Sequence, residues 1–196
     1  AAVAAAADEG IAVSEQALAA ALAVAHVSCG SFHSLCVLRS GAVCAWGAGA
    51  PQLGLGELAD APAPQRVGGG LSAVRATAAG VAHSAAVGAK GGALWTFGDN
   101  SEGQLGIGSV DGACALPQRV TALAAIRVRG VACGGFFTLA LTATGDVLSW
   151  GQGTSGQLGH GDFDCEATPR VVRALLGKHV RQLSAGAAHA AAVTSA

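Results

Sequence analysis

The stretch Trp150–Asp162, WGQGTSGQLGHGD, places five glycines in thirteen residues directly behind a tryptophan. Glycine-rich loops of this kind can bind phosphate, but similar sequences recur as GDNSEGQLGIG at 98–108 and GAGAPQLGLG at 47–56. A phosphate loop needs a helix N-terminus after it, and a P-loop needs a lysine; neither signal follows these loops. The recurrence predicts structural loops and argues against a nucleotide site.

Around each loop lies a longer repeat. Its openings read VSCGSFHSLCVL from residue 27, ATAAGVAHSAAV from 76, VACGGFFTLALT from 131 and LSAGAAHAAAVT from 183. The shared glycines at 30, 80, 134 and 186 are therefore 50, 54 and 52 residues apart. A period near fifty predicts a stacked or radial array of units.

Within each unit the residues are typical of strands. HSLCVL and AVCAW lie on either side of RSG, and FTLALT and DVLSW repeat this pattern, as expected for β-hairpins. PQRV at 64–67 and 117–120, and TPRVV at 168–172, suit an outer edge strand, where a proline costs little. Four strands per unit predict all-β architecture, with each unit one blade of a β-propeller.

Leucine and glycine occupy fixed places in the repeated loop. Leu53, Leu105 and Leu158 stand between the glutamine and the glycine of QLG, and we interpret each as an apolar plug beneath the loop. Glycines at alternate positions permit the tight turns and close approach that a blade corner requires.

These words resemble the regulator of chromosome condensation repeat family, whose blades open with CG-x-x-H-[ST] and carry WG-x-N-x-x-GQLG-x-G at their centre. The resemblance covers residues 27–196 and departs from the pattern at Phe137, which replaces the repeat histidine, and at Pro51, which replaces a glycine. The structural positions it marks are Gly30, His33, Trp46, Gly80, His83, Phe97, Gln104, Leu105, Gly106, Gly134, Trp150, Gln157, Leu158, Gly159, Gly186 and His189.

The resemblance implies a seven-bladed ring, of which this chain supplies about three and a third blades. The expected units are an Ala-rich arm or short helix at 1–25, blades at 26–75, 76–128 and 129–179, and the start of a fourth at 180–196. An open arc exposes sheet faces and strand edges. We therefore expect further chain, or partners, to cover its ends.

Charge and cysteine content narrow the function classes. A formal net charge of −1 gives no electrostatic reason to expect nucleic acid or an acidic membrane surface as a partner, and no segment is apolar enough to predict membrane insertion. The six cysteines lack the paired spacing of a zinc site, so neither a metal nor a disulfide is expected. No cofactor is predicted. Family resemblance and unpaired cysteines favour an intracellular, eukaryotic protein.

Two clusters are candidates for chemistry. Asp162, Phe163, Asp164 and Glu166 lie in one variable loop, where the acids are either a general acid/base pair or an exposed acidic tip that meets a partner. We favour partner recognition, because propeller loops carry the function of the scaffold and the acids lack supporting groups. His33, His83 and His189 recur in register, but Phe137 interrupts the set. Buried imidazoles that bond to the backbone within or between blades are therefore favoured over a metal site.

Several functions compete. A non-catalytic protein–protein interaction scaffold, as part of a larger assembly, is favoured because no catalytic constellation is present. Guanine-nucleotide exchange on a small GTPase, an activity of the founding family member, is the alternative. Chromatin binding ranks lower because it would require basic loops or tails. Ultraviolet reception, which one plant branch performs with tryptophans before the repeat histidine, is disfavoured because those places hold Phe32, Ala82, Phe136 and Ala188.

Overall fold

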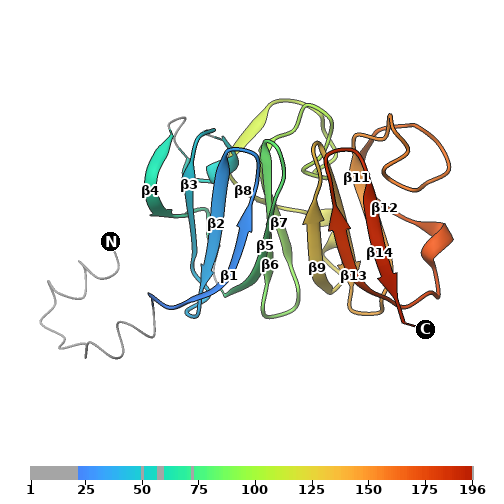
Figure 1. Ribbon diagram of the computed structural model, residues 1–196, viewed down its shortest axis with the longest axis horizontal. Helices are drawn as coiled ribbons and strands as arrows, with labels where there is room; N and C mark the ends of the chain where they lie inside the picture. Colours follow the sequence, from blue (N-terminus) through green and yellow to red (C-terminus); the bar gives the residue numbers. More distant parts are fainter. Residues whose placement is uncertain (1–21, 50, 57–59, 72, 196) are drawn as a thin grey trace, which may run out of the picture.

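The computed structural model describes residues 22–49, 51–56, 60–71 and 73–195. Three four-stranded sheets and one two-stranded sheet follow one another in chain order (Figure 1). The first holds β1 (Val24–Cys29), β2 (His33–Leu38), β3 (Val43–Gly47) and β4 (Ala61–Arg66). The second holds β5 (Val74–Ala79), β6 (His83–Gly88), β7 (Leu94–Asp99) and β8 (Ala113–Arg119). The third holds β9 (Val128–Cys133), β10 (Phe137–Thr142), β11 (Val147–Gly151) and β12 (Glu166–Val171). The last holds β13 (Val180–Ala185) and β14 (Ala190–Thr194).

Each sheet is an antiparallel meander, and the four sheets stand side by side as blades along an arc (Figure 1). The first strands of successive blades, β1, β5, β9 and β13, contact one another. Three short 3₁₀ helices lie in the connections and are η1 (Pro51–Leu53), η2 (Thr121–Leu123) and η3 (Arg173–Leu175). The predicted all-β propeller architecture of four-stranded blades is confirmed.

The repeat accounts for the strand order. In the first hairpin, β2 pairs with β3 so that His33 lies opposite Gly47, and Phe137 lies opposite Gly151 in the third blade. The proline-containing pieces form β4, β8 and β12, each at the outer edge of its sheet. A proline at an edge removes a backbone donor that no neighbouring strand would use.

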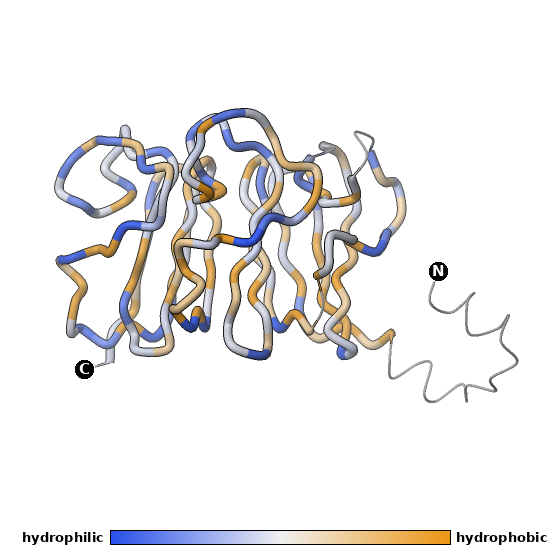
Figure 2. Tube along the Cα trace, turned by 180° about the vertical axis from the view of Figure 1, so that it is seen from behind, coloured by the Kyte–Doolittle hydropathy of each residue, from blue (hydrophilic) through white to orange (hydrophobic). Residues whose placement is uncertain are grey.

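The hydrophobic core lies between blades. One cluster joins Leu35 and Val37 of the first blade to Phe97 of the second, and another joins Leu94 of the second blade to Trp150 of the third. Phe97 and Trp150 are fully buried, and Figure 2 shows the hydrophobic residues running along the strands while hydrophilic ones gather in the loops at both ends. Burying an aromatic side chain contributes about 1.5–3 kcal/mol, so packing between neighbours stabilises the arc.

The Gly-rich loops pack forward onto the next blade. A Cβ added at Gly54 would lie 2.8 Å from the ring of Phe97, and one at Gly106 would lie 2.5 Å from Trp150 Nε1. Both glycines have positive φ, +69° in each case. The plugging leucines Leu53, Leu105 and Leu158 are buried beneath these loops. Glycine is required here because a side chain would separate the two blades.

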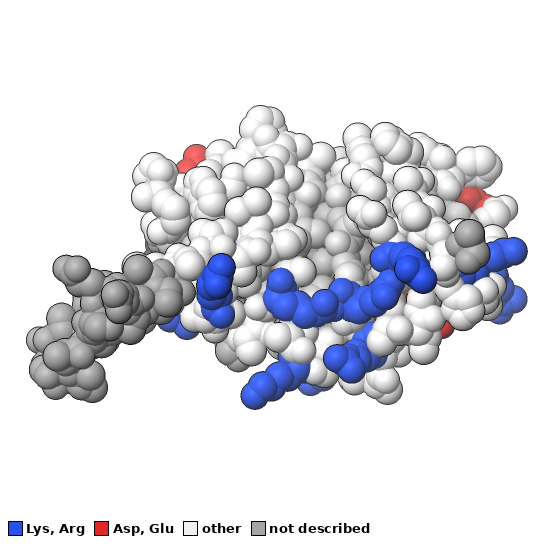
Figure 3. All heavy atoms as spheres, turned by 60° about the horizontal axis from the view of Figure 1, so that its bottom comes forward, with Lys and Arg blue, Asp and Glu red and all other residues white. Residues whose placement is uncertain are grey.

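The blades have two chemically different ends. The upper end in Figure 1 carries the Gly-rich loops; the lower end carries the β2–β3, β6–β7 and β10–β11 turns and the starts of the first strands. Figure 3 brings the lower end forward and shows lysines and arginines in a line across it. All but Arg170 lie at or near this end, and they are Arg39, Arg66, Arg75, Lys90, Arg119, Arg127, Arg129, Arg173, Lys178 and Arg181. Although the net charge is only −1, positive charge is therefore concentrated at one end of the blades.

The predicted N-terminal arm or helix lies almost wholly outside the described residues. Within the part of the chain that the structure describes, no helix is long and apolar enough to cross a lipid bilayer.

Candidate protein-binding site

The loop between β11 and β12, residues 152–165, is held closed at its neck. The Gly153 amide donates to Cys165 Sγ at 3.4 Å. A Cβ on Gly153 would collide with the carbonyl oxygen of Asp164, so the two sides of the neck are in contact. Between them, Gly156 N donates to Gly153 O at 2.7 Å and Gly159 N to Gly156 O at 3.1 Å. Successive tight turns thus build a loop with a defined path.

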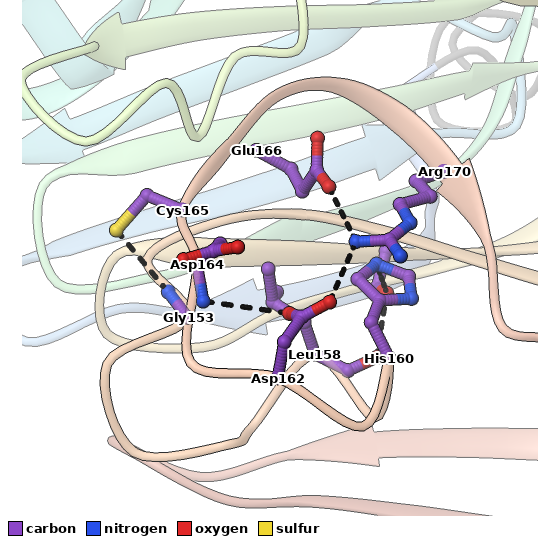
Figure 4. A network of polar contacts seen from close by, with 9 residues as sticks. Gly153, Leu158, His160, Asp162, Asp164, Cys165, Glu166 and Arg170 are labelled. Carbon is purple, nitrogen blue, oxygen red and sulfur yellow. Dashed lines mark hydrogen bonds and ion pairs between the residues drawn. The ribbon is translucent and has the colours of Figure 1, made fainter.

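Arg170 of β12 lies between Asp162 of this loop and Glu166, the first residue of β12 (Figure 4). Its Nη1 is 3.0 Å from Asp162 Oδ2 and 2.7 Å from Glu166 Oε1. The hydrogen bond from Arg170 lowers the pKa of Asp162, and the pKa of Arg170 is raised by its bonds to Glu166 and Asp162. A general acid at neutral pH needs a raised pKa, so this environment disfavours that role for Asp162.

The other two loop residues are exposed. The Asp164 amide donates weakly to Asp162 Oδ1 at 3.4 Å, and Asp164 itself is exposed. Phe163 is 70% exposed, although an apolar ring of this size is normally covered. The site therefore presents an aromatic side chain next to a free acid and an arginine-bridged acid pair.

His160 shares this loop, but its contacts are internal. Its Nε2 lies 3.0 Å from Ser149 Oγ, which also donates to Leu158 O at 2.7 Å. Ser149 is fully buried, so the pair is not an accessible nucleophile and base. Partial burial, followed by the charge of Arg170, lowers the pKa of His160.

Contacts to the preceding blade also fix the loop. Cys165 Sγ lies 3.7 Å from Glu102 Oε2, and Gly108 N donates to Ala167 O at 3.0 Å. Sequence reasoning did not identify Arg170 or His160 as members of this site. Arg170 belongs to the outer-strand segment TPRVV, and no sequence spacing predicts its contact with Asp162. The contact forms because the loop folds back onto β12.

The repeat histidines form relays between blades. His33 Nε2 lies 2.8 Å from Ser84 Oγ of the next blade, and His83 Nε2 lies 2.9 Å from Thr138 Oγ1. Thr138 donates to Gln104 O at 2.8 Å, so it accepts from the imidazole and Nε2 carries the proton. The structure thus places a neighbouring hydroxyl, and not a backbone group, opposite each of these Nε2 atoms.

Burial keeps these imidazoles neutral. His33 and His83 are 3% and 0% exposed, and burial lowers the pKa of each to about 4. Their Nδ1 atoms have no hydrogen-bond partner, which agrees with Nε2 carrying the proton and Nδ1 being unprotonated. His189 lies in the turn before β14 and, unlike the other two histidines, is exposed. Among the described residues, no group of three metal-ligating side chains is close enough to hold an ion.

The cysteines and tryptophans lie within the strands and loops of the blades. All six cysteines are unpaired thiols, and burial raises the pKa of Cys133 to about 12, which makes it a poor nucleophile. Trp150 Nε1 donates to Gln104 O of the preceding blade at 2.9 Å. Trp46 and Trp95 are partly buried within β3 and β7.

Comparison with known proteins gives a consistent result. The model of the regulator of chromosome condensation (RCC1) repeat matches residues 91–141 and 144–193, and a second RCC1-repeat model matches 128–157. The chain is 37% identical to human E3 ubiquitin-protein ligase HERC2 over 87% of its length and 4% of HERC2. It is 38% identical to the Arabidopsis thaliana ultraviolet-B receptor UVR8, over 86% of the chain and 38% of the receptor.

Solved structures agree. The crystal structure of human WBSCR16 matches with a TM-score of 0.79 at 31% identity, covering 88% of this chain and 45% of that protein. The chain spans less than half of each of these three proteins.

Proposed function

The chain belongs to the regulator of chromosome condensation (RCC1) repeat family, and we propose that it is a non-catalytic protein–protein interaction scaffold within a larger assembly. The observation that carries this proposal is the loop 152–165, whose path is fixed by internal contacts while Phe163 stays 70% exposed.

An exposed aromatic on an ordered loop is suited to binding a protein. Aromatic and arginine side chains supply most of the binding energy at interfaces, and an ordered loop loses little entropy on binding. Phe163 would enter a pocket of the partner, with Asp164 contributing charge at the edge. Asp162, Glu166 and Arg170 would hold the loop in its binding shape.

Capture with matched variants tests this site. The immobilised protein, Phe163→Ala and Phe32→Ala are each exposed to lysate, and bound proteins are identified by mass spectrometry. Phe32 is 72% exposed and lies between β1 and β2, so it controls for general loss of an exposed ring. We expect at least one protein to be captured by the wild type and by Phe32→Ala, and lost with Phe163→Ala. An identical set for all three baits would contradict the site.

A second candidate, nucleotide exchange on a small GTPase, draws support from the acids of the upper end. The loops there carry exposed Asp60, Asp111 and Asp164, and the half-buried Asp99 and Glu102. An acidic, loop-bearing face is what the family resemblance requires for that activity. Release of a fluorescent guanine nucleotide, measured across a panel of small GTPases, would identify exchange; no acceleration with any of them would reject it.

A further inference from the structure

The lower end carries arginines that the fold repeats from blade to blade. Arg75, Arg129 and Arg181 each follow the first valine of β5, β9 and β13. Arg127 precedes β9 and Lys178 lies just before β13, and all five side chains belong to exposed residues. We call these five residues the basic rim. One cation in each of the second, third and fourth sheets, together with two loop cations, contributes to the line visible in Figure 3.

Backbone contacts orient the rim without neutralising it. Arg75 Nη2 donates to Val128 O of the next blade at 3.2 Å. Arg129 Nη2 donates to Val180 O at 3.0 Å and to Arg181 O at 2.9 Å. Each guanidinium has five N–H donors, so most of them remain available to another ligand.

In the part of the chain that the structure describes, no carboxylate forms an ion pair with these five cations. Among the described residues, the ion pairs between side chains all involve Arg170, whose guanidinium meets Asp162 of the upper loop and Glu166. The described acid at the lower end is Asp146, which accepts from Thr144 Oγ1 at 2.7 Å. The pKa of Arg75 is lowered by partial burial and then by the charges of Arg127 and Arg129, so the rim cations repel one another. An anionic partner would relieve this repulsion.

A polar hollow lies at one end of the rim. Arg129 and Arg181 line it with His179, Thr144 and Ser195. The hydroxyls of Thr144 and Ser195 already donate to Asp146 and to His179 O, so the donors left at this depression are the two guanidiniums. Two guanidiniums at one depression can receive a carboxylate through charge-assisted hydrogen bonds.

We propose that the basic rim binds an acidic, extended segment of a partner protein, with one carboxylate in the hollow between Arg129 and Arg181. This inference rests on the proposed scaffold function and gives it a second surface, at the end of the blades opposite Phe163. Binding would be governed by charge, and therefore weakened by salt.

Carboxylates are favoured over nucleic-acid phosphates for two reasons. The chain has a pI of about 6.6 and a net charge of −1, whereas nucleic-acid-binding domains are usually strongly basic overall. The exposed aromatic rings, Phe32 and Phe163, both lie at the upper end, so the rim offers no described platform on which bases could stack.

Fluorescence anisotropy provides the test. The labelled probes are a short peptide of alternating Asp and Ser, the same peptide with Asn in place of Asp, and single- and double-stranded DNA of similar length. The variants are Arg181→Glu and Arg127→Glu, neither of which removes a side-chain hydrogen bond seen in the structure. Arg66→Glu, which makes the same change in net charge at the end of β4, is the matched control. Circular dichroism melts establish that each variant is folded.

We expect the Asp peptide to bind, the Asn peptide not to bind, and both rim variants to weaken binding by about tenfold or more, with less than about a twofold change for Arg66→Glu. Tighter binding of either DNA than of the Asp peptide would overturn the proposal, as would an absence of peptide binding or equal effects of all three variants. Capture of a partner through Phe163 is a separate readout. If capture persists while the peptide does not bind, the rim proposal alone is rejected. If the peptide binds while capture fails, the upper-loop proposal alone is rejected.

Discussion

The interface between the second and third blades and the interface between the third and fourth blades use the same repeat positions in different ways. In the interface between the second and third blades, His83 faces Thr138, whose hydroxyl donates a hydrogen bond to Gln104 O. In the latter, the histidine position holds Phe137, which packs with Leu139 and Leu158, and the hydroxyl position holds Ala190. Both members of the polar pair have changed together.

The difference teaches that the unit of this repeat is the pair across the interface. A buried polar group left without its partner costs about 1–3 kcal/mol, whereas replacing both partners by apolar groups can be nearly neutral. Phe137 is thus not an isolated irregularity of one blade. It is the first half of an apolar substitution that Ala190 completes.

Acid should produce the largest effect and should act on the polar interfaces. Unfolded histidine binds a proton near pH 6.5, while burial lowers the pKa of His33 and His83 to about 4. Their stabilising effect is complete above about pH 6.5 and is lost as the pH falls towards 4, by about 3 kcal/mol for each histidine. Urea unfolding at a series of pH values measures this slope. A His83→Phe/Thr138→Ala variant should lose about half of it; an unchanged slope would place the acid sensitivity elsewhere.

A methyl group at the Gly-rich loops should next distinguish a loop that packs on the following blade from a loop whose glycine meets only its own blade. Gly106→Ala meets Trp150 of the next blade as well as the strain of positive φ, so we expect a loss of about 2–5 kcal/mol in unfolding free energy. Gly159→Ala has a similar φ of +73° but meets only Val172, at 3.4 Å, and should cost about 1–2 kcal/mol. Equal losses in urea titrations would show that backbone strain alone is responsible.

Transplanting the apolar pair tests the pairing directly. Thr138→Ala leaves the buried imidazole N–H unpaired and should cost about 1–3 kcal/mol; His83→Phe alone should cost about 1 kcal/mol. The double variant reproduces the combination found at Phe137 and Ala190, and should be more stable than the sum of the single effects by about 1 kcal/mol. A double-mutant cycle by chemical denaturation measures the coupling, and strict additivity would refute it.

The smallest expected effect concerns Arg170, which lies outside both interfaces. Its ion pairs are exposed, so Arg170→Ala should change the global unfolding free energy by less than about 1 kcal/mol. Hydrogen exchange of the amides of residues 152–165 should nevertheless accelerate, because Asp162 and Glu166 lose their common partner. Arg173→Ala, a nearby exposed arginine without an ion pair in the structure, is the control. Unchanged exchange in this loop would mean that its glycine turns alone define its path.

The sequence predicted the backbone better than the side-chain contacts. Strands, edge prolines and plugging leucines follow from local pattern and from the fifty-residue period, since each copy reinforces the same assignment. The hydroxyl partners of His33 and His83 could not be identified in this way, because they become neighbours only when two blades are in place. Arg170 and the basic rim were missed for a related reason. The net charge sums all charged residues of the sequence, whereas the fold places the lysines and arginines mainly at one end and the acids mainly at the other.

Three of the contacts between blades share one direction. The relay of His83, the loop around Gly106 and the side chain of Arg75 all extend from one blade to the blade that follows it in the chain. During synthesis, each finished blade would therefore already present these groups, and the next blade would pack against them as it leaves the ribosome. The blades would then fold in order from the N-terminal side. A destabilising substitution in one blade would impair the folding of the following blade more than that of the preceding one.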